Sequence, residues 1–330
     1  MLETRPGTAG PIRASRRSGC RSEFRLFAAI LLVGSTTACT EQAAEWQRES
    51  VPTPTVFAPG VISSSERDYG ITFTPDGTEA YFTRRSRRGP PGILVSRFAE
   101  GAWSTPGLAS FSTDRDESPF LTPDGGTLVF SSRRPLTGQV DPNENLWLVD
   151  RTETGWGEAR PVEGSVNEPG VDLGRYTLGT ELGPTLLPDG SLLYWTRSDP
   201  AWGSDLYVAS PDGSGGFVDP RPLRINTHGE ESNPVLSPDG RFLVFQAYRD
   251  AEGVGEQDLY VSARTDYGWQ DPVLLPEPIN STANDGWPSF SPNGKHFFFA
   301  SDREAASGFY DIWWVDTEAL GLRTTDQRPR

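Results

Sequence analysis

The sequence predicts an all-β protein, a β-propeller of five four-stranded blades in which the N-terminal strand completes the last blade. Two observations lead to this fold class. The tripeptide Pro-Asp-Gly recurs at steps of 48 to 65 residues along the chain. The composition is also rich in Gly (35), Pro (29) and aromatic residues (11%). This mixture favours many short strands joined by tight turns over long helices.

The N-terminal part is predicted to be an export signal. Five arginines between Arg13 and Arg25 precede a short apolar run over 26–34, and small residues then lead to Cys39. This order is typical of a signal peptide, and the apolar run is too short to span a bilayer comfortably. Because the site ends on a cysteine, it resembles a bacterial lipoprotein signal, which implies a lipid on Cys39. The alternative is an ordinary signal peptide that is cut nearby.

We therefore expect a leader over 1–39, a flexible polar tether over 40–54 and one propeller domain over 55–330. Six arginines and two glutamates give residues 1–39 a charge of +4. Because the whole chain carries −15, residues 40–330 carry −19. Such an acidic surface repels nucleic acid and argues against nucleic-acid binding. Both cysteines lie in the leader, so the predicted domain can form neither a disulfide nor a thiolate metal site.

The repeated turn belongs to a longer pattern. Four Pro-Asp-Gly turns and a Pro-Asn-Gly variant begin at Pro75, Pro123, Pro188, Pro238 and Pro292. An acid lies seven residues before each proline, an apolar residue two before it and an aromatic residue seven after it. A third apolar run, such as 258–261, and a Gly-aromatic step come next. Each unit therefore predicts an antiparallel blade whose first two strands are joined by the turn.

The two ends of the repeat predict how the ring closes. The fifth unit has no good fourth strand after Val315, whereas residues 56–58 align with the fourth strand at 273–275. We expect the N-terminal segment to supply the missing outer strand, which removes an exposed sheet edge. Six blades is the alternative, but no sixth repeat is left in the sequence.

The pattern acid–x–x–Pro–x–apolar–x–Pro-Asp-Gly, with an aromatic second strand and Asp-Leu-Tyr-Val in the third, resembles the WD-like repeat of the TolB propeller family. It covers about residues 55–322. The resemblance implies an exported propeller, in a family that includes periplasmic scaffolds, sensors and propellers attached to serine peptidases. The sequence contains no Gly-x-Ser-x-Gly elbow, so peptidase activity is not expected.

The candidate binding site is the channel mouth on the face opposite the Pro-Asp-Gly turns. The aligned acids open the innermost strands and are expected to ring this mouth, together with Glu117 and three arginines that end second strands. The full set is Asp68, Asp116, Glu117, Glu181, Glu231, Asp285, Arg84, Arg133 and Arg197. The carboxylates could hold Ca²⁺ or receive a basic peptide, and the arginines could clamp a carboxylate. The alternative is structural: each acid accepts N–H groups from a neighbouring blade, and the arginines pair with the acids.

Two functions stay open. The favoured one is a non-catalytic binding or scaffold lipoprotein of the cell envelope, which presents one propeller face to an envelope protein, peptide or glycan. It would contact the membrane only through its lipid. In a Gram-negative host this would be the outer membrane, because Thr40, which follows the lipidated cysteine, is not an acidic retention signal. The other is a glycan hydrolase, which needs two carboxylates about 5–9.5 Å apart at the channel. The five acids look equivalent, and this favours binding.

Overall fold

The structure is a computed structural model that describes residues 44–113, 115–137, 143–168, 170–172, 177–199, 203–248, 253–304 and 309–322. In these residues the regular structure is almost entirely antiparallel strand, as predicted. None of the helices in these ranges is long and apolar enough to cross a membrane.

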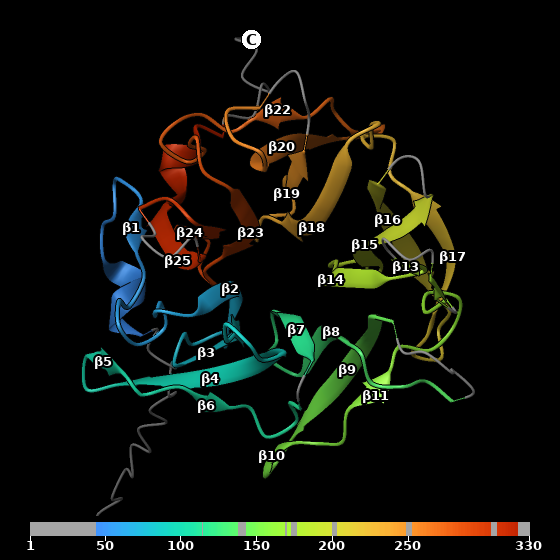
Figure 1. Cartoon of the computed structure of the whole chain (residues 1–330), viewed down its shortest axis with the longest axis horizontal. Coiled ribbons are helices and arrows are strands. Elements are labelled where there is room, and N and C mark those ends of the chain that lie inside the picture. The colour runs from blue at the N-terminus through green and yellow to red at the C-terminus, as the bar shows by residue number, and fades with distance from the viewer. Residues whose placement is uncertain are drawn as a thin grey trace, which may run out of the picture. The chain divides into compact units, whose positions relative to one another are not determined.

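Five blades surround a central channel, and in each blade the strand named first below lies nearest the channel (Figure 1). Blade one consists of β2 (Arg67–Phe73), β3 (Glu79–Arg85), β4 (Pro91–Ala99), β5 (Ala102–Trp103) and β6 (Gly107–Leu108). Blade two consists of β7 (Asp116–Leu121), β8 (Thr127–Ser132), β9 (Asn145–Thr152), β10 (Gly155–Trp156) and β11 (Arg160–Pro161). Blade three consists of β14 (Glu181–Leu186), β15 (Leu192–Asp199), β16 (Gly203–Pro211) and β17 (Phe217–Pro222).

Blade four consists of β18 (Glu230–Leu236), β19 (Phe242–Tyr248), β20 (Asp258–Thr265), β21 (Gly268–Trp269) and β22 (Val273–Leu274). Blade five consists of β23 (Asp285–Phe290), β24 (His296–Ser301), β25 (Asp311–Asp316) and β1 (Thr55–Val56). A separate hairpin of β12 (Val171–Asp172) and β13 (Thr177–Leu178) lies in the long connection between blades two and three. The prediction of five blades is confirmed.

The closure of the ring by the N-terminal segment is also confirmed. β1 pairs with β25 in antiparallel register, with Thr55 opposite Trp314 and Val56 opposite Trp313. The Phe57 N–H then donates to the Ile312 carbonyl at 2.8 Å. Blade five is therefore a four-stranded sheet built from both ends of the described chain, and its β25 has no exposed edge.

The repeated turns are fixed by their acidic side chain. In blade two, the Asp124 carboxylate accepts the Thr122 hydroxyl at 2.5 Å and the Gly126 N–H at 3.0 Å. These hydrogen bonds hold the pKa of Asp124 below its usual range. The glycine at the third position has a positive φ, 71° for Gly125. This is the left-handed conformation that glycine adopts without steric cost.

Hydrophobic cores fill the joins between blades. The described residues form one buried cluster at each of the five joins, and each cluster combines side chains from two adjacent blades. At the closing join, Phe73 of blade one packs against Phe298 of blade five with ring centroids 4.9 Å apart. Aromatic side chains dominate here because a large ring spans the gap between two twisted sheets.

The segment before β1 belongs to the packed domain. Residues Glu45–Arg48 form the 3-10 helix η1, in which Trp46 is 2% exposed and donates from its indole to the Gly77 carbonyl at 2.8 Å. The sequence predicted a flexible tether over 40–54, but from Ala44 onward these residues lie against the propeller. The burial of Trp46 among Phe57, Phe73 and Phe298 explains the difference.

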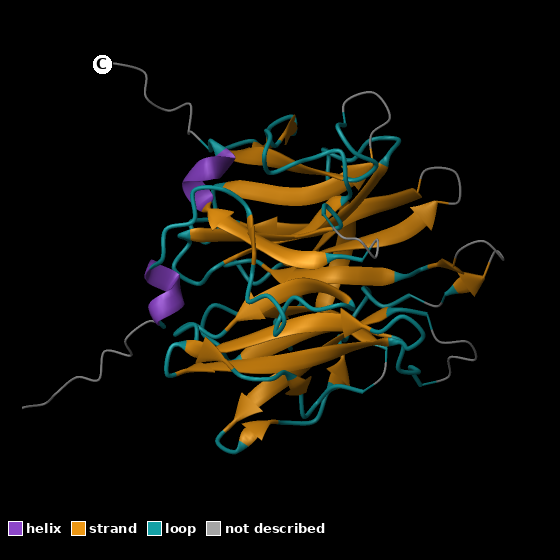
Figure 2. Cartoon of the chain, turned by 60° about the vertical axis from the view of Figure 1, so that its left-hand side comes forward, coloured by secondary structure: helices purple, strands orange, loops and turns teal. Residues whose placement is uncertain are grey.

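The propeller has two unlike faces. The turn face carries the Pro-Asp-Gly turns together with η1 and η2 (Thr317–Leu320), which Figure 2 shows in purple on one side of the molecule. The loop face carries the long connections and the first residues of the innermost strands. These two names are used below.

Each innermost strand contains a bulge two residues after its aligned acid. The residue there has a positive φ in every blade, from 46° to 58°, at Gly70, Ser118, Gly183, Asn233 and Trp287. At three joins its N–H reaches a polar side chain of the preceding blade: Ser118 to Thr83 (2.9 Å), Gly183 to Ser131 (3.2 Å) and Trp287 to Gln246 (2.9 Å). The bulge therefore connects neighbouring blades while it turns the strand toward the channel.

Ser118→Gly is expected to raise the free energy of unfolding by about 0.5 kcal/mol. The left-handed conformation costs a residue with a side chain about 1–2 kcal/mol, and the greater freedom of glycine in the unfolded chain offsets part of the gain. Urea unfolding measures the change. A loss above about 1 kcal/mol would show that the Ser118 side chain stabilises the bulge.

Candidate functional site

The five aligned acids lie in the walls of the propeller. Asp68, Asp116, Glu181, Glu231 and Asp285 have at most 1% of their surface exposed. They begin the innermost strands on the loop face, as predicted, but their side chains are buried under the connections that lead into each blade. A ligand in the channel would not meet these carboxylates.

Asp68 shows how such an acid is held. Its carboxylate accepts the N–H and the hydroxyl of Ser64 at 2.8 and 2.7 Å, and it pairs with Arg84 at 2.6 Å. The Arg84 guanidinium also donates to the carbonyls of Val61 and Ile62 at 3.0 and 2.9 Å. Acid and arginine together tie the incoming connection to the blade. We call this arrangement the bracket.

Blade five repeats the bracket with Asp285. Its carboxylate accepts the Ser281 N–H at 2.7 Å and pairs with Arg303 at 2.6 Å. Arg303 donates in turn to the carbonyls of Pro278, at 2.6 Å, and Ile279.

In blade two the arginine is one residue later than the sequence suggested. Arg134, not Arg133, pairs with Asp116 at 2.6 Å and donates to the Phe111 carbonyl at 2.7 Å. Side chains of successive residues after β8 point in different directions, so Arg133 does not reach the carboxylate that Arg134 contacts. Arg133 lies 3.4 Å from the Glu144 carboxylate instead.

Blades three and four depart from this arrangement. Glu231 accepts the Thr227 N–H and hydroxyl at 3.1 and 2.6 Å. Glu181 accepts a long bond from the Thr196 hydroxyl, at 3.4 Å, and backbone bonds from Glu168 and from its own N–H. Its Oε2 atom has no hydrogen-bond partner among the described residues. Burial raises the pKa of Glu181 to about 9, and the Glu168 carboxylate adds to the rise. Glu181 is therefore neutral at pH 7.

Arg197 and Cys39 are also among the predicted residues. Arg197 lies in β15, where its carbonyl accepts the Gly179 N–H at 3.1 Å. Cys39 lies outside the described residues. In the part of the chain that the structure describes, no group of three carboxylates or histidines converges as a metal site would require. The structure thus provides no ligand set for the Ca²⁺ that the acids suggested.

Glu117 contacts the innermost strand of the neighbouring blade. Its carboxylate accepts the Tyr69 hydroxyl at 2.8 Å, and the Tyr69 ring packs on Trp287 with centroids 4.7 Å apart. Burial raises the pKa of Glu117, and the hydrogen bond from Tyr69 counters part of this rise. Glu144, held by Arg133, is close enough to raise it further. Glu117 therefore differs from the five aligned acids, because its carboxylate contacts an aromatic side chain of a neighbouring innermost strand.

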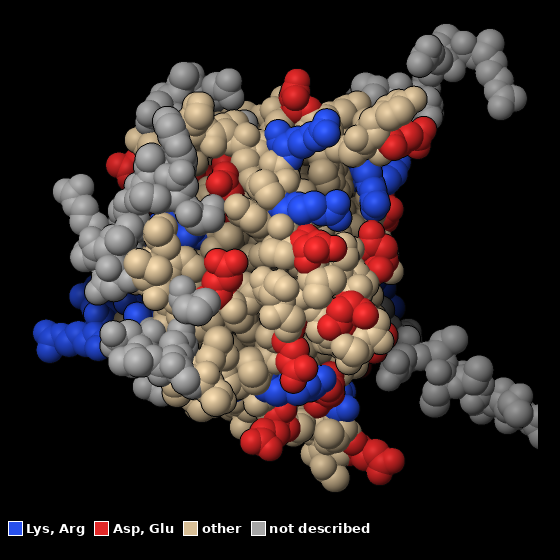
Figure 3. Space-filling model, turned by 90° about the vertical axis from the view of Figure 1, so that its right-hand side faces the viewer, with Lys and Arg blue, Asp and Glu red and all other residues tan. Residues whose placement is uncertain are grey.

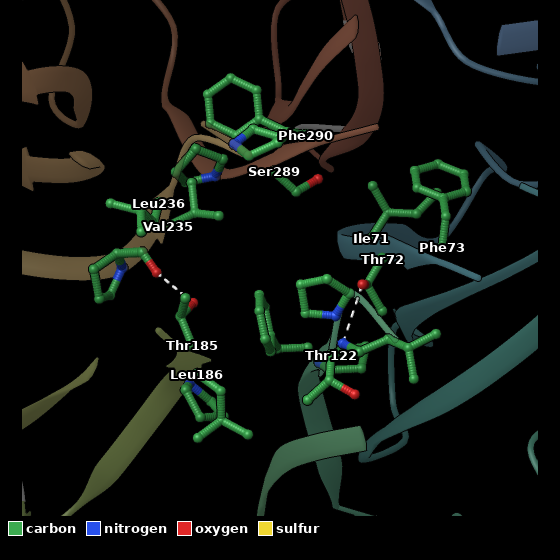
Figure 4. A pocket seen from close by; sticks show the side chains of 18 of the residues that line it. Ile71, Thr72, Phe73, Thr122, Thr185, Leu186, Val235, Leu236, Ser289 and Phe290 are labelled. Carbon is green, nitrogen blue, oxygen red and sulfur yellow. Dashed lines mark hydrogen bonds between the residues drawn. The ribbon is translucent and has the colours of Figure 1, made fainter. Parts of the chain in front are cut away.

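A cavity of about 720 Å³ occupies the channel on the turn face. It extends from the strand bulges to the Pro-Asp-Gly turns. Its lining includes the apolar residue that precedes each turn by two positions, namely Phe73, Leu121, Leu186, Leu236 and Phe290. Figure 4 shows Leu236, Phe290 and Leu186 around this space, with Ile71 and Phe73 on the far wall.

Prolines give the cavity its chemical character. Nine lining residues are prolines, from the bulges and from the turns: Pro75, Pro119, Pro123, Pro184, Pro188, Pro234, Pro238, Pro288 and Pro292. Proline has no N–H, so the wall presents carbonyl oxygens and apolar carbon in preference to donors. Two polar side chains are already engaged, since Thr185 donates to the Pro234 carbonyl at 2.7 Å and Thr72 accepts the Leu121 N–H at 3.1 Å (Figure 4).

The cavity was not predicted from the sequence. The apolar column two residues before each turn was visible, but it was interpreted as part of the blades. The signal that could have found it is the proline three residues after the acid, in blades two to five. Proline has no N–H to pair with a neighbouring strand, and the channel side of an innermost strand has no neighbouring strand.

The outer wall offers no comparable feature. In Figure 3, acidic and basic side chains are interspersed over the side formed around β16 and β17. Interspersed charges of this kind keep a surface soluble and identify no particular ligand.

No family model matches the chain, and no curated protein matches it. Several solved structures do. A protein described as a glycoside hydrolase has a TM-score of 0.54 at 10% identity, over 85% of this chain and 92% of its own. A thermostable family-43 glycoside hydrolase has a TM-score of 0.50 at 12% identity, over 81% of this chain and 90% of its own. TolB from Acinetobacter baumannii has a TM-score of 0.47 at 17% identity. The match covers 76% of this chain and 55% of that protein. At these identities the likeness shows the propeller fold alone.

Proposed function

We propose that this chain is a non-catalytic binding protein of the cell envelope, and that the cavity on the turn face holds an extended, apolar peptide segment of another envelope protein. The observation that carries the proposal is the contrast between the two parts of the channel. The cavity is large enough for several side chains and is apolar, whereas the aligned acids are enclosed in the walls.

A peptide fits the lining better than a sugar does. The lining prolines offer no backbone N–H, and a peptide backbone brings one N–H donor of its own per residue. Apolar side chains of the peptide would replace water over the leucines and phenylalanines, which is the main source of binding energy at such a surface. The one carboxylate of the lining, Asp124, is engaged in its own turn.

The proposed lipid anchor would place the cavity near the membrane. The Ala44 N–H donates to the Asp76 carbonyl at 2.8 Å, so the chain enters the described domain at the turn face. Ala44 is five positions after Cys39, and five extended residue steps span at most about 18 Å. A lipid on Cys39 would thus turn this face toward the membrane and toward partners that lie close to it.

Leu236→Arg tests the binding site. It places a charge in the apolar cavity, and we expect it to weaken binding of apolar peptides by about 100-fold or more, because that charge would be buried without a partner. The whole chain, solubilised in mild detergent, is titrated against an array of labelled nine-residue peptides by fluorescence anisotropy. Tyr267→Arg is the matched control, since Tyr267 is 100% exposed in the β20–β21 hairpin. Failure of every peptide to bind, or equal binding by both variants, would contradict the proposal.

The second candidate function is a glycan hydrolase with Glu117 as its acid. One observation favours it: Glu117 is buried with a raised pKa, while Glu144 beside it is paired with Arg133. Unequal carboxylates of this kind are what glycoside hydrolysis uses. Hydrolysis of nitrophenyl glycosides by the wild type, lost in both Glu117→Gln and Glu144→Gln, would replace the binding proposal with this one.

A further inference from the structure

Two arginines face each other on the loop face of blade one. Arg67 opens β2, Arg85 ends β3, and the antiparallel register places them directly opposite. Directly opposed side chains have Cβ atoms about 4.5–5.5 Å apart, and like charges in such a pair destabilise the sheet. An anion held between the two guanidinium groups would remove that cost.

No carboxylate of the described residues lies within ion-pair distance of this pair, although Arg85 is near enough to Glu117 to lower the pKa of that carboxyl. Within the described ranges, no ion pair involves the guanidinium of Arg67, Arg85 or the nearby Arg87, although the bracket arginines each reach a carboxylate at 2.6 Å. Glu66 accepts the backbone N–H of Arg87, not its guanidinium. The Nε atom of Arg67 is buried and has no hydrogen-bond partner among the described residues. An unpaired buried donor of this kind is costly, so the site is incomplete without a ligand.

Aromatic rings hold the arginines in place. The Arg67 guanidinium lies 5.7 Å from the centroid of Phe309 and 5.5 Å from that of Tyr310. Arg87 lies 4.9 Å from the Phe309 centroid. Stacking occupies the flat face of a guanidinium and leaves its edges, which carry the N–H donors, free for a planar anion. These contacts restrict the Arg67 and Arg87 side chains before any ligand binds, which lowers the entropic cost of binding.

We propose that Arg67, Arg85 and Arg87 bind the carboxylates of an acidic glycan, one built from uronic acid units. A carboxylate matches the guanidinium fork and forms two parallel hydrogen bonds with it. The ring of the sugar would lie against the aromatic surface that continues from Tyr310 to Trp287, whose centroids are 5.0 Å apart. The arginines of this site are on the loop face and are not among the residues that line the peptide cavity, although Trp287 belongs to both sites.

The test is calorimetric titration of the whole chain with trigalacturonate at low salt. We expect binding that weakens as salt is added, because the contacts are charged and partly exposed. Arg67→Gln and Arg85→Gln are each expected to weaken it by about tenfold or more. Arg241→Gln is the matched control, since Arg241 is an exposed arginine that already pairs with Asp239. The methyl ester of the same trisaccharide lacks the charges and is expected not to bind.

A second measurement needs no ligand. Removing one charge of the opposed pair relieves its repulsion, so Arg85→Gln is expected to unfold about 1–3 °C above the wild type. A lower unfolding temperature for this variant would show that the pair is not repulsive and would overturn the proposal. Trigalacturonate binding that survives Arg67→Gln would also overturn it. Equal binding of a hexaglutamate peptide would overturn the assignment to a glycan.

Discussion

Arg303→Ala is expected to lower the free energy of unfolding by about 3–5 kcal/mol. The substitution leaves the Asp285 carboxylate, which is 0% exposed, without the cation that lies 2.6 Å from it. It also removes the donors of the Pro278 and Ile279 carbonyls in the connection into blade five. Isolated charges in a protein interior are among the most destabilising changes that a single substitution can make. Urea unfolding followed by tryptophan fluorescence measures the loss.

Arg241→Ala is the control for this experiment. Arg241 and Asp239 are also 2.6 Å apart, but their side chains are 57% and 46% exposed. Exposed pairs contribute about 0–1 kcal/mol, so the two variants separate the effect of burial from that of distance. The double variant Asp285→Asn with Arg303→Met removes both charges and is expected to recover part of the stability. If Arg303→Ala costs no more than Arg241→Ala, the bracket does not stabilise the blade.

Glu181→Gln is expected to stabilise the protein by about 3 kcal/mol at pH 7 and to have little effect at pH 4. The pKa of Glu181 is raised to about 9 from an ordinary value of 4.5. Folding at pH 7 therefore requires this side chain to take up a proton, which costs about 1.4 kcal/mol for each pH unit above 4.5. Wild-type stability should fall as the pH rises from about 4.5 to 9, and a glutamine removes this dependence. Thermal or urea unfolding at pH 4, 6, 7 and 8 measures both curves.

Glu231→Gln is the matched control in the next blade. The Glu231 carboxylate accepts two hydrogen bonds from Thr227, at 3.1 and 2.6 Å, and a neutral amide accepts them less strongly. We expect this variant to lose about 1–2 kcal/mol at pH 7. A Glu181→Gln protein that is less stable than the wild type at pH 7 and 8 would show that Glu181 is charged in the folded state.

The blades and their closure could be predicted because each blade repeats the same local sequence pattern. A tight turn, an acid and an aromatic residue at fixed spacing define one antiparallel sheet without reference to the others. The alignment of residues 56–58 with 273–275 then identified the closing strand. Its pairing with β25 confirms that inference. Local sequence was sufficient here because the strands of a blade follow one another directly.

The roles of individual side chains were harder to predict. The sequence placed the five acids at the start of the innermost strands but left open whether they face the channel or the walls. Side-chain direction alternates along a strand, and a bulge changes the alternation, so a difference of one residue decides the outcome. The same effect separates Arg134, which pairs with Asp116, from Arg133, which does not.

The cavity and the packed N-terminal segment depend on features that no local pattern contains. The width of the channel is set by the angle between blades and by the bulges at positions such as Ser118 and Trp287. Trp46 lies in a polar stretch, and its burial depends on aromatic residues from blades one and five, which are far apart in the sequence. Such long-range packing overrides local composition.

The composite fifth blade has a consequence for the order of folding. The Ser63 hydroxyl and the Ile312 carbonyl that meet there are 249 residues apart. The other four blades can form from contiguous segments as soon as these are available, but the last one needs both segments together. Because long-range contacts form slowly, ring closure is expected to be the final and slowest step. Until it occurs, β25 presents an open sheet edge, and this interval is when the chain is most exposed to proteases and to aggregation.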